Sequence, residues 1–174
     1  YRNGQWRKRV TERNKQSGKA WEHYVDAELE SMNAIALGHW ARCPEPLRAL
    51  RQLGDGRVEA VWAKKAQPDY YGILPGGTGC VFDAKLVTDS DRFDFSRVAV
   101  HQLEAMCRCA RAGGVAFVYL GRYPEQEKYV LPVDADGAIC GVRDKRHIKF
   151  ERLGAYQKLK GEYLAETIRR IYAH

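Results

Sequence analysis

Residues 115–120, Val-Ala-Phe-Val-Tyr-Leu, form a continuous apolar run that constrains the fold more than any other stretch of this chain. A strand with apolar side chains on both faces needs a covering layer on each side, which is typical of a central strand in a helix-flanked sheet. Gly113 and Gly114 stand just before the run and end a helix predicted over residues 95–111. The run therefore predicts an α/β fold.

The remaining periodic segments complete a mixed sheet flanked by helices. Short β-like runs over residues 69–74, 80–87 and 129–133 predict further strands, the first two joined by the Gly-rich turn at 75–79. An apolar stripe from Trp21 to Met32 predicts a helix that begins at about Ser17, and Leu164, Ile168 and Ile171 predict a last helix over 162–172. The pattern over residues 39–66 predicts an extended segment followed by a protruding insertion, which is either hairpin-like or helical.

The chain has 174 residues, which suits one domain, and its positive charge is concentrated at one end. Residues 1–19 carry seven of the 29 Lys and Arg residues and one of the 22 acids, so the rest of the chain is nearly neutral. We predict a flexible basic arm over residues 1–16 and a single domain over 17–174 with an insertion at about 47–66. The arm favours a nucleic-acid partner, while a tail that only aids solubility is the alternative.

Membrane and disulfide-stabilised classes of protein are not favoured. No apolar run approaches the roughly 18 residues that span a bilayer, and the first residues do not resemble a signal peptide. The five cysteines are scattered and form no C-x-x-C pair, which favours reduced thiols in a cytoplasmic protein over a zinc site. The expected location is the cytoplasm, or the host cytoplasm if the chain is phage-encoded.

Two acids and a lysine lie together on the predicted hairpin. Side chains alternate along a strand, so Asp83 and Lys85 emerge on one face, about 6–7 Å apart, while Phe82 and Ala84 face the other way. Asp69 opens the neighbouring strand. Paired carboxylates are the hard oxygen ligands that Mg²⁺ prefers, and an adjacent lysine can activate water or neutralise charge on phosphorus. A plain surface ion pair between Asp83 and Lys85 is the alternative.

Two further polar residues are out of place on apolar faces. Gln102 falls in the middle of the apolar stripe of the predicted helix, where a buried amide needs a polar partner. Glu22 sits at the edge of the first helix's apolar face, where it can look into a cleft. A core hydrogen bond for Gln102 and a simple helix-edge charge for Glu22 remain open alternatives.

These residues resemble a known family of enzymes. The matching segments are Gly18-Lys19-Ala20-Trp21-Glu22, Pro68-Asp69, Phe82-Asp83-Ala84-Lys85 and His101-Gln102. They are similar to the motifs of PD-(D/E)xK nucleases and, among these, of RecU-like Holliday junction resolvases, including phage-encoded forms. The resemblance covers roughly residues 17–123. It departs from the family at Asp83, where Glu is usual, and at Glu45, where a small hydroxyl residue is expected between two prolines.

The resemblance implies a restriction-endonuclease-like fold and a homodimer that nicks four-way DNA junctions with Mg²⁺, for which Mn²⁺ is an expected substitute. It implies that Asp69, Asp83, the Ala84 carbonyl and Glu22 hold the metal. Lys85 would position or activate the water, and Gln102 would orient the active-site groups. The insertion at 47–66 would be the family's stalk. The implied DNA contacts are the basic residues of arm and stalk: Arg2, Arg7, Lys8, Arg9, Arg13, Lys15, Lys19, Arg48, Arg51, Arg57, Lys64 and Lys65.

These residues are compatible with three functions. The leading hypothesis is a Holliday junction resolvase that acts in DNA recombination and repair by paired phosphodiester hydrolysis. Another repair or restriction-like nuclease of the same superfamily is the nearest alternative, and a non-catalytic DNA-binding module is the third. Paired cuts on a four-way junction, equal cutting of junction and duplex, or binding without cutting would distinguish them.

Overall fold

The central sheet has five strands, and its mixed direction agrees with the sequence prediction. The computed structural model describes residues 2–44, 47–52, 58–62, 67–88, 90–143 and 146–173; within these, the side chains of 2–16, 47–49, 51–52 and 58–62 are not described. The sheet order is β1-β4-β5-β7-β8, and β5 and β7 are parallel whereas the other neighbours are antiparallel. The strands are β1 His39–Arg42, β4 Tyr70–Ile73, β5 Gly79–Thr88, β7 Val115–Tyr123 and β8 Glu127–Pro132.

Helices cover both faces of this sheet and create two cores. Phe117 and Tyr119 of β7 pack into a core with α1 (Arg2–Ala34) and α3 (Leu164–Tyr172). Val118 and Leu120 point to the opposite face, where α2 (Val100–Arg111) closes the second core. The run at 115–120 is thus buried on both faces, as predicted.

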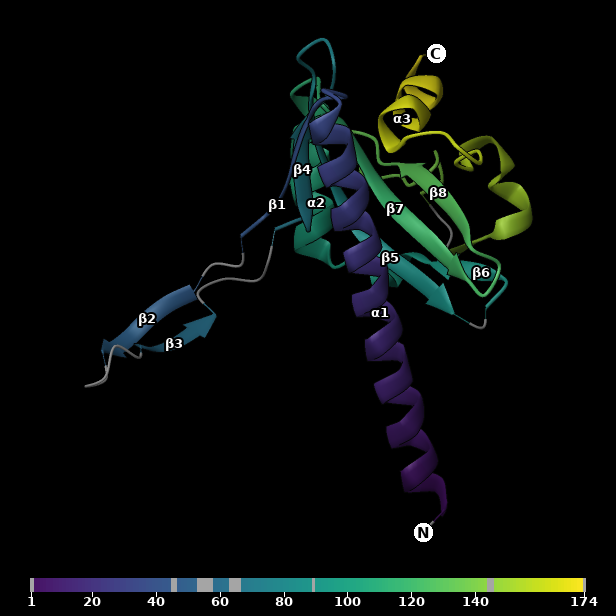
Figure 1. Ribbon diagram of the computed structural model, residues 1–174. Helices are drawn as coiled ribbons and strands as arrows, with labels where there is room; N and C mark the ends of the chain where they lie inside the picture. The colour runs from purple at the N-terminus through teal and green to yellow at the C-terminus, as the bar shows by residue number, and fades with distance from the viewer. Residues whose placement is uncertain are drawn as a thin grey trace.

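The first helix is much longer than the sequence analysis predicted. Its C-terminal half is held to the sheet by the buried stripe of Trp21, Val25, Leu29 and Met32. The helix does not begin at Ser17 but at Arg2, and its N-terminal half runs beyond the sheet (Figure 1). Residues 2–16 contain no proline and are rich in good helix formers, so a helix anchored further along can propagate through them. The expected flexible arm over 1–16 is therefore corrected to a helical extension over 2–16.

The insertion is a hairpin. β2 (Leu47–Gln52) pairs antiparallel with β3 (Val58–Trp62) in a separate two-stranded sheet. This pair stands away from the central sheet and from α1 (Figure 1). Of the hairpin and helical forms considered from the sequence, the hairpin is the one found.

Several short elements complete the fold. β6 (Arg92–Asp94) pairs antiparallel with β9 (His147–Lys149), and neither was predicted. The helix predicted from residue 95 begins as a separate 3-10 turn, Phe95–Arg97, before α2 starts at Val100. Two further 3-10 turns, Phe150–Arg152 and Gly154–Tyr156, precede α3. No helix within the described ranges is both long enough and apolar enough to cross a bilayer.

Candidate active site

The site forms where one strand ladder ends before its neighbour does. β4 pairs with β5 only as far as the partners Tyr70 and Phe82, whereas β7 follows β5 on to Thr88. From Asp83 onward, none of the described strands pairs with the β4-side edge of β5, which we call its open edge. Asp69 precedes β4 and reaches across this opening, where its Oδ2 accepts a hydrogen bond of 3.1 Å from the Ala84 amide nitrogen.

The Ala84 carbonyl points into the same opening. The N–H and C=O groups of one strand residue face the same neighbouring strand, and the Ala84 N–H faces Asp69. The β4–β5 register ends before Ala84, so β4 supplies no ladder partner for this carbonyl. A carboxylate and a backbone carbonyl thus converge at one edge of the sheet, and both are oxygen donors suited to Mg²⁺.

Asp83 is the buried centre of the site. Its side chain is fully buried, and its Oδ1 accepts a hydrogen bond of 2.5 Å from Gln102 Nε2 on α2. Its Oδ2 forms an ion pair with Lys85 Nζ, whose side chain remains partly exposed. Asp83 and Lys85 thus share the sheet face toward α2, while Phe82 packs into the opposite core, as the strand alternation predicted.

Burial and charge raise the pKa of the Asp83 carboxyl to about 7. The largest cause is desolvation, the second is the negative charge of the neighbouring Asp69, and the Lys85 ammonium opposes both. Two adjacent carboxylates compensated by one lysine form a site that lacks positive charge. Such a donor set fits a divalent cation, which would neutralise both acids.

Additional protein ligands are limited. Within the described part of the chain, no group of three or more His, Cys, Asp or Glu side chains is arranged to hold a metal. A cation at Asp69 and Asp83 would therefore complete its coordination with the backbone carbonyl, water or substrate oxygens, which is the usual habit of Mg²⁺.

Gln102 satisfies both ends of its amide at this site. Its Oε1 accepts a hydrogen bond of 3.1 Å from the Ala99 amide at the start of α2, and its Nε2 donates to Asp83. The buried amide on an apolar helix face, noted from the sequence, is thus explained by a polar partner on β5. The contact fixes the orientation of the Asp83 carboxylate.

Glu22 lies beside the site but is engaged elsewhere. It shares with Lys85 a cleft of about 280 Å³ between α1 and the open half of β5. Its carboxylate, 44% exposed, forms an ion pair with Arg42 of β1, and Arg42 also approaches Asp26 at 3.3 Å. The structure therefore places Glu22 at the cleft without joining it to Asp69 and Asp83, and its metal-ligand role stays a prediction.

Sequence reasoning missed a second cation at this cleft. Arg97, from the 3-10 turn before α2, lines it together with Lys85 and Thr88. Its side chain is exposed and forms no ion pair with any of the described residues. No sequence pattern marks this arginine, because only the path of the turn brings it beside a strand twelve positions earlier.

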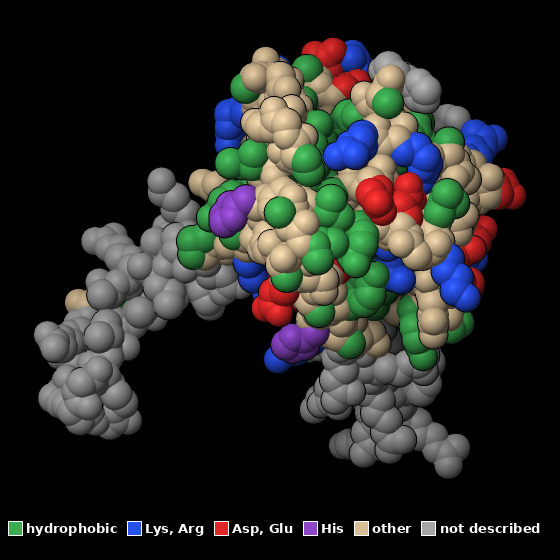
Figure 2. Space-filling model, turned by 45° about the horizontal axis from the view of Figure 1, so that its top comes forward, with side chains coloured by type: hydrophobic (Ala, Val, Ile, Leu, Met, Phe, Trp, Pro, Cys, Tyr) green, Lys and Arg blue, Asp and Glu red, His purple; other side chains and the backbone are tan. Residues whose placement is uncertain are grey.

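One of the predicted DNA contacts has a described side chain. Lys19 is described and exposed on α1. On the face shown in Figure 2, basic and acidic side chains are interspersed over the described surface, consistent with the nearly neutral charge of the chain beyond residue 19. The side chains of the other predicted contacts lie outside the described residues: Arg2, Arg7, Lys8, Arg9, Arg13, Lys15, Arg48, Arg51, Arg57, Lys64 and Lys65.

Comparison with known proteins gives a consistent set of matches. The sequence matches the family RecU, "Recombination protein U", over residues 18–163. It is 30% identical over 105 residues to the Holliday junction resolvase RecU of Pediococcus pentosaceus, covering 55% of this chain and 52% of that protein. It is also 30% identical over 76 residues to the RecU resolvase of Ligilactobacillus salivarius, covering 44% of this chain and 35% of that protein. The alignments thus span about half or less of these relatives' lengths.

The fold also has a solved counterpart. The structure of Archaeoglobus fulgidus Hjc, a Holliday junction resolvase, superposes with a TM-score of 0.50, covering 87% of this chain and 95% of that one. The sequence identity is 17%, so this likeness supports the restriction-endonuclease-like fold and nothing finer.

Proposed function

Because the chain belongs to the RecU family, we propose that it is a metal-dependent endonuclease that resolves four-way DNA junctions by paired phosphodiester hydrolysis. The observation that carries this proposal is the convergence of Asp69, Asp83 and Lys85 at the open edge of β5. A simple surface ion pair does not explain a fully buried aspartate beside a second carboxylate.

Each residue at the site has a distinct proposed role. The carboxylates of Asp69 and Asp83, with the Ala84 carbonyl, would hold Mg²⁺ or, in its place, Mn²⁺. These residues would thereby place positive charge beside the scissile phosphate and make a nearby water easier to deprotonate. Lys85 Nζ, held by Asp83, would orient the attacking water beside that phosphate.

Two further residues would support this arrangement. Gln102 would keep Asp83 in one orientation, since its amide is itself fixed at the start of α2. Glu22 would support the metal site from the adjoining cleft, which it lines together with Lys85.

The basic extension of α1 and the β2–β3 stalk would bind DNA. Phosphate contacts by lysine and arginine supply affinity without reading sequence, as a junction-selective enzyme requires. We also propose a homodimer acting in the cytoplasm, since paired nicks across a junction need two sites related by a two-fold axis.

The deciding experiment compares DNA substrates of different shape. A synthetic four-way junction and a linear duplex of the same sequence are incubated with the protein, with Mg²⁺ and with EDTA. Paired nicks near the crossover, on the junction alone and only with Mg²⁺, are expected. Equal cutting of both substrates would replace the proposal with a general nuclease, and binding without cutting would replace it with a DNA-binding module.

A further inference from the structure

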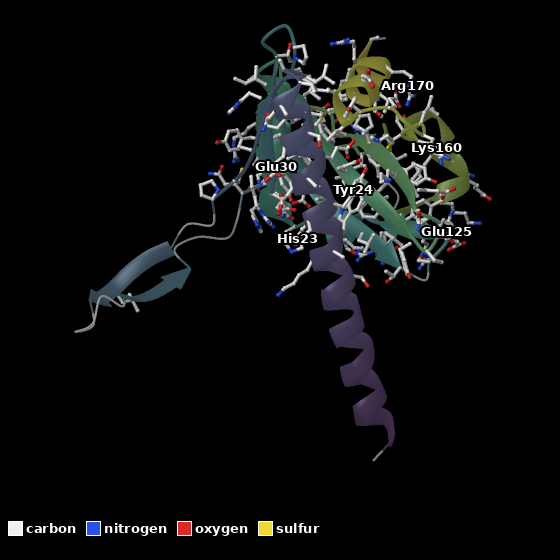
Figure 3. The ribbon with its side chains drawn as sticks, in the orientation of Figure 1. His23, Tyr24, Glu30, Glu125, Lys160 and Arg170 are labelled. Carbon is white, nitrogen blue, oxygen red and sulfur yellow. The ribbon has the colours of Figure 1, made fainter. Side chains whose placement is uncertain are left out.

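A second hollow adjoins the cleft that Glu22 and Lys85 line, and Trp21 borders both spaces. It has a volume of about 520 Å³ and lies between α1, the ends of β5 and β7, and the start of β8. Trp21 and Leu86 line both the hollow and the cleft that holds Lys85, so the two spaces are neighbours. Tyr24, which also lines it, projects from the side of α1 that faces β7 and β8 (Figure 3).

Aromatic rings and a cation characterise the hollow. The rings of Trp21 and Tyr24 are stacked with centroids 5.4 Å apart, and Lys128 Nζ lies 4.5 Å from the Tyr24 centroid. Tyr123 adds a ring that is 48% exposed. Gly121 is part of the lining, and a Cβ there would come within 2.9 Å of the Trp21 ring. The glycine thus lets the indole lie directly on β7.

One polar atom of a residue that lines the hollow is unsatisfied. Trp21 is 8% exposed, and its indole Nε1–H is buried without a hydrogen-bond acceptor among the described residues. Buried indole N–H groups normally find a partner, because leaving one unpaired is costly. Ring nitrogens and carbonyl oxygens, such as those of a nucleobase, are acceptors of the kind that this N–H lacks.

We propose that this hollow receives a nucleobase of the strand being cut, next to the scissile phosphate. The inference rests on the proposed function, since the phosphate would lie in the adjoining cleft beside Lys85. Bases stack on aromatic side chains whatever their sequence, and they carry the acceptors that Trp21 lacks. A base must leave its stack to enter, which is easier at a branch point than within a duplex. The hollow would thereby contribute to junction selectivity without reading sequence.

The first test fills the hollow. Ala20 lines it from an exposed position on α1, so Ala20→Phe occupies the space without removing a core contact. Ala27 lies two helical turns further along the same face, is also exposed, and does not line the hollow, so Ala27→Phe is the matched control. Junction affinity, measured by fluorescence anisotropy in EDTA, should fall by roughly five- to a hundredfold for Ala20→Phe alone. Equal affinities for the two variants would overturn the proposal.

The second test asks whether the contact is to a base. Tyr123→Ala and Tyr123→Phe are titrated with intact junctions and with junctions that carry one abasic nucleotide, placed in turn at each position near the cut. Tyr123→Ala should bind the intact junction more weakly, Tyr123→Phe should restore binding, and the loss should vanish at one abasic position. A loss that persists on every abasic junction would refute base binding.

Failure of this inference can be told from failure of the proposed function. The same variants are titrated with a single-stranded oligonucleotide, which offers unstacked bases but no junction. If the wild type shows no preference for junctions but Ala20→Phe still weakens single-strand binding, the base pocket stands and the resolvase function falls. If junctions are cut selectively and neither variant changes binding to either DNA, the function stands and the pocket falls.

Discussion

The two halves of β5 belong to one strand but have different neighbours. Over residues 80–82 the strand lies between β4 and β7, and the ring of Phe82 stacks between Tyr70 and Phe117 at centroid distances of 4.9 and 4.7 Å. Beyond Phe82, β7 is the only described strand that still pairs with β5, and β5 presents Asp83 and Lys85 beside its open edge. Because the β4–β5 ladder ends at Phe82, one part of β5 packs in the core and the other presents polar groups suited to a cation and a phosphate.

The largest expected effect is a loss of catalysis when a residue in the open half of β5, residues 83–88, is changed. Asp83→Asn removes one of two carboxylates that would hold the metal, and we expect junction cleavage to fall by ~10³-fold or more. Binding in EDTA should change little, because the proposed phosphate contacts lie on α1 and the stalk. Single-turnover cleavage and anisotropy measure the two quantities, with Asp91→Asn, an exposed acid, as control. Near wild-type cleavage by Asp83→Asn would show that the metal site lies elsewhere.

A change in the half of β5 that pairs with β4, residues 79–82, should affect stability instead. Phe82→Ala removes a fully buried ring from between two others, and we expect the free energy of unfolding to fall by about 3–5 kcal/mol. Urea unfolding measures this loss, and Ile73→Ala, about half exposed at the end of β4, should cost less than ~1 kcal/mol. Cleavage per folded molecule should remain near that of the wild type. A loss of cleavage as large as that of Asp83→Asn in still-folded protein would erase the distinction between the two halves.

Local patterns along single elements predicted much of this arrangement. Alternation along β5 placed Asp83 and Lys85 on one face, and the amide of Gln102 in an apolar stripe pointed to a buried polar partner. Each of these signals lies within a few residues of sequence. The doubly buried run of β7 likewise fixed the layered fold.

Features that depend on tertiary contact were not predictable. The Arg42 partner of Glu22 is 20 residues away on another element, and Arg97 joins the cleft only through the path of a short turn. The strands β6 and β9 have three residues each, too few to show a period. The helix over 2–16 lacks an apolar stripe, so composition alone did not distinguish it from an arm.

A smaller effect concerns stability and pH without metal. The Asp83 pKa is about 7 in the folded protein and about 3.9 in an unfolded chain, so the folded state binds more protons between these values. This carboxyl therefore destabilises the fold progressively as pH rises from about 4 to about 7, by about 4 kcal/mol, and no further above. Asp83→Asn lacks this dependence. Urea unfolding of both proteins in EDTA should show the wild type losing stability relative to the variant over that range.

Metal should offset much of that loss. Mg²⁺ at a hundred times its dissociation constant adds about 2.7 kcal/mol to the wild type at pH 8 and nothing to a variant that cannot bind it. Parallel pH curves for wild type and Asp83→Asn, or an equal response of both to Mg²⁺, would show that Asp83 does not carry the charge of the site.

The smallest expected effect tests whether the cleft beside the open half of β5 includes Arg97, a residue that the sequence did not predict there. Arg97 lines the cleft with Lys85 and forms no ion pair with the described residues, so its guanidinium is available for a phosphate. Arg97→Ala should lower kcat/KM on junctions about tenfold and reduce the salt dependence of binding by about one phosphate contact. Arg108→Ala, on the exposed face of α2, is the control. If the two variants behave alike, the cleft ends at Lys85 and Thr88, and the turn before α2 serves only to position Gln102 against Asp83.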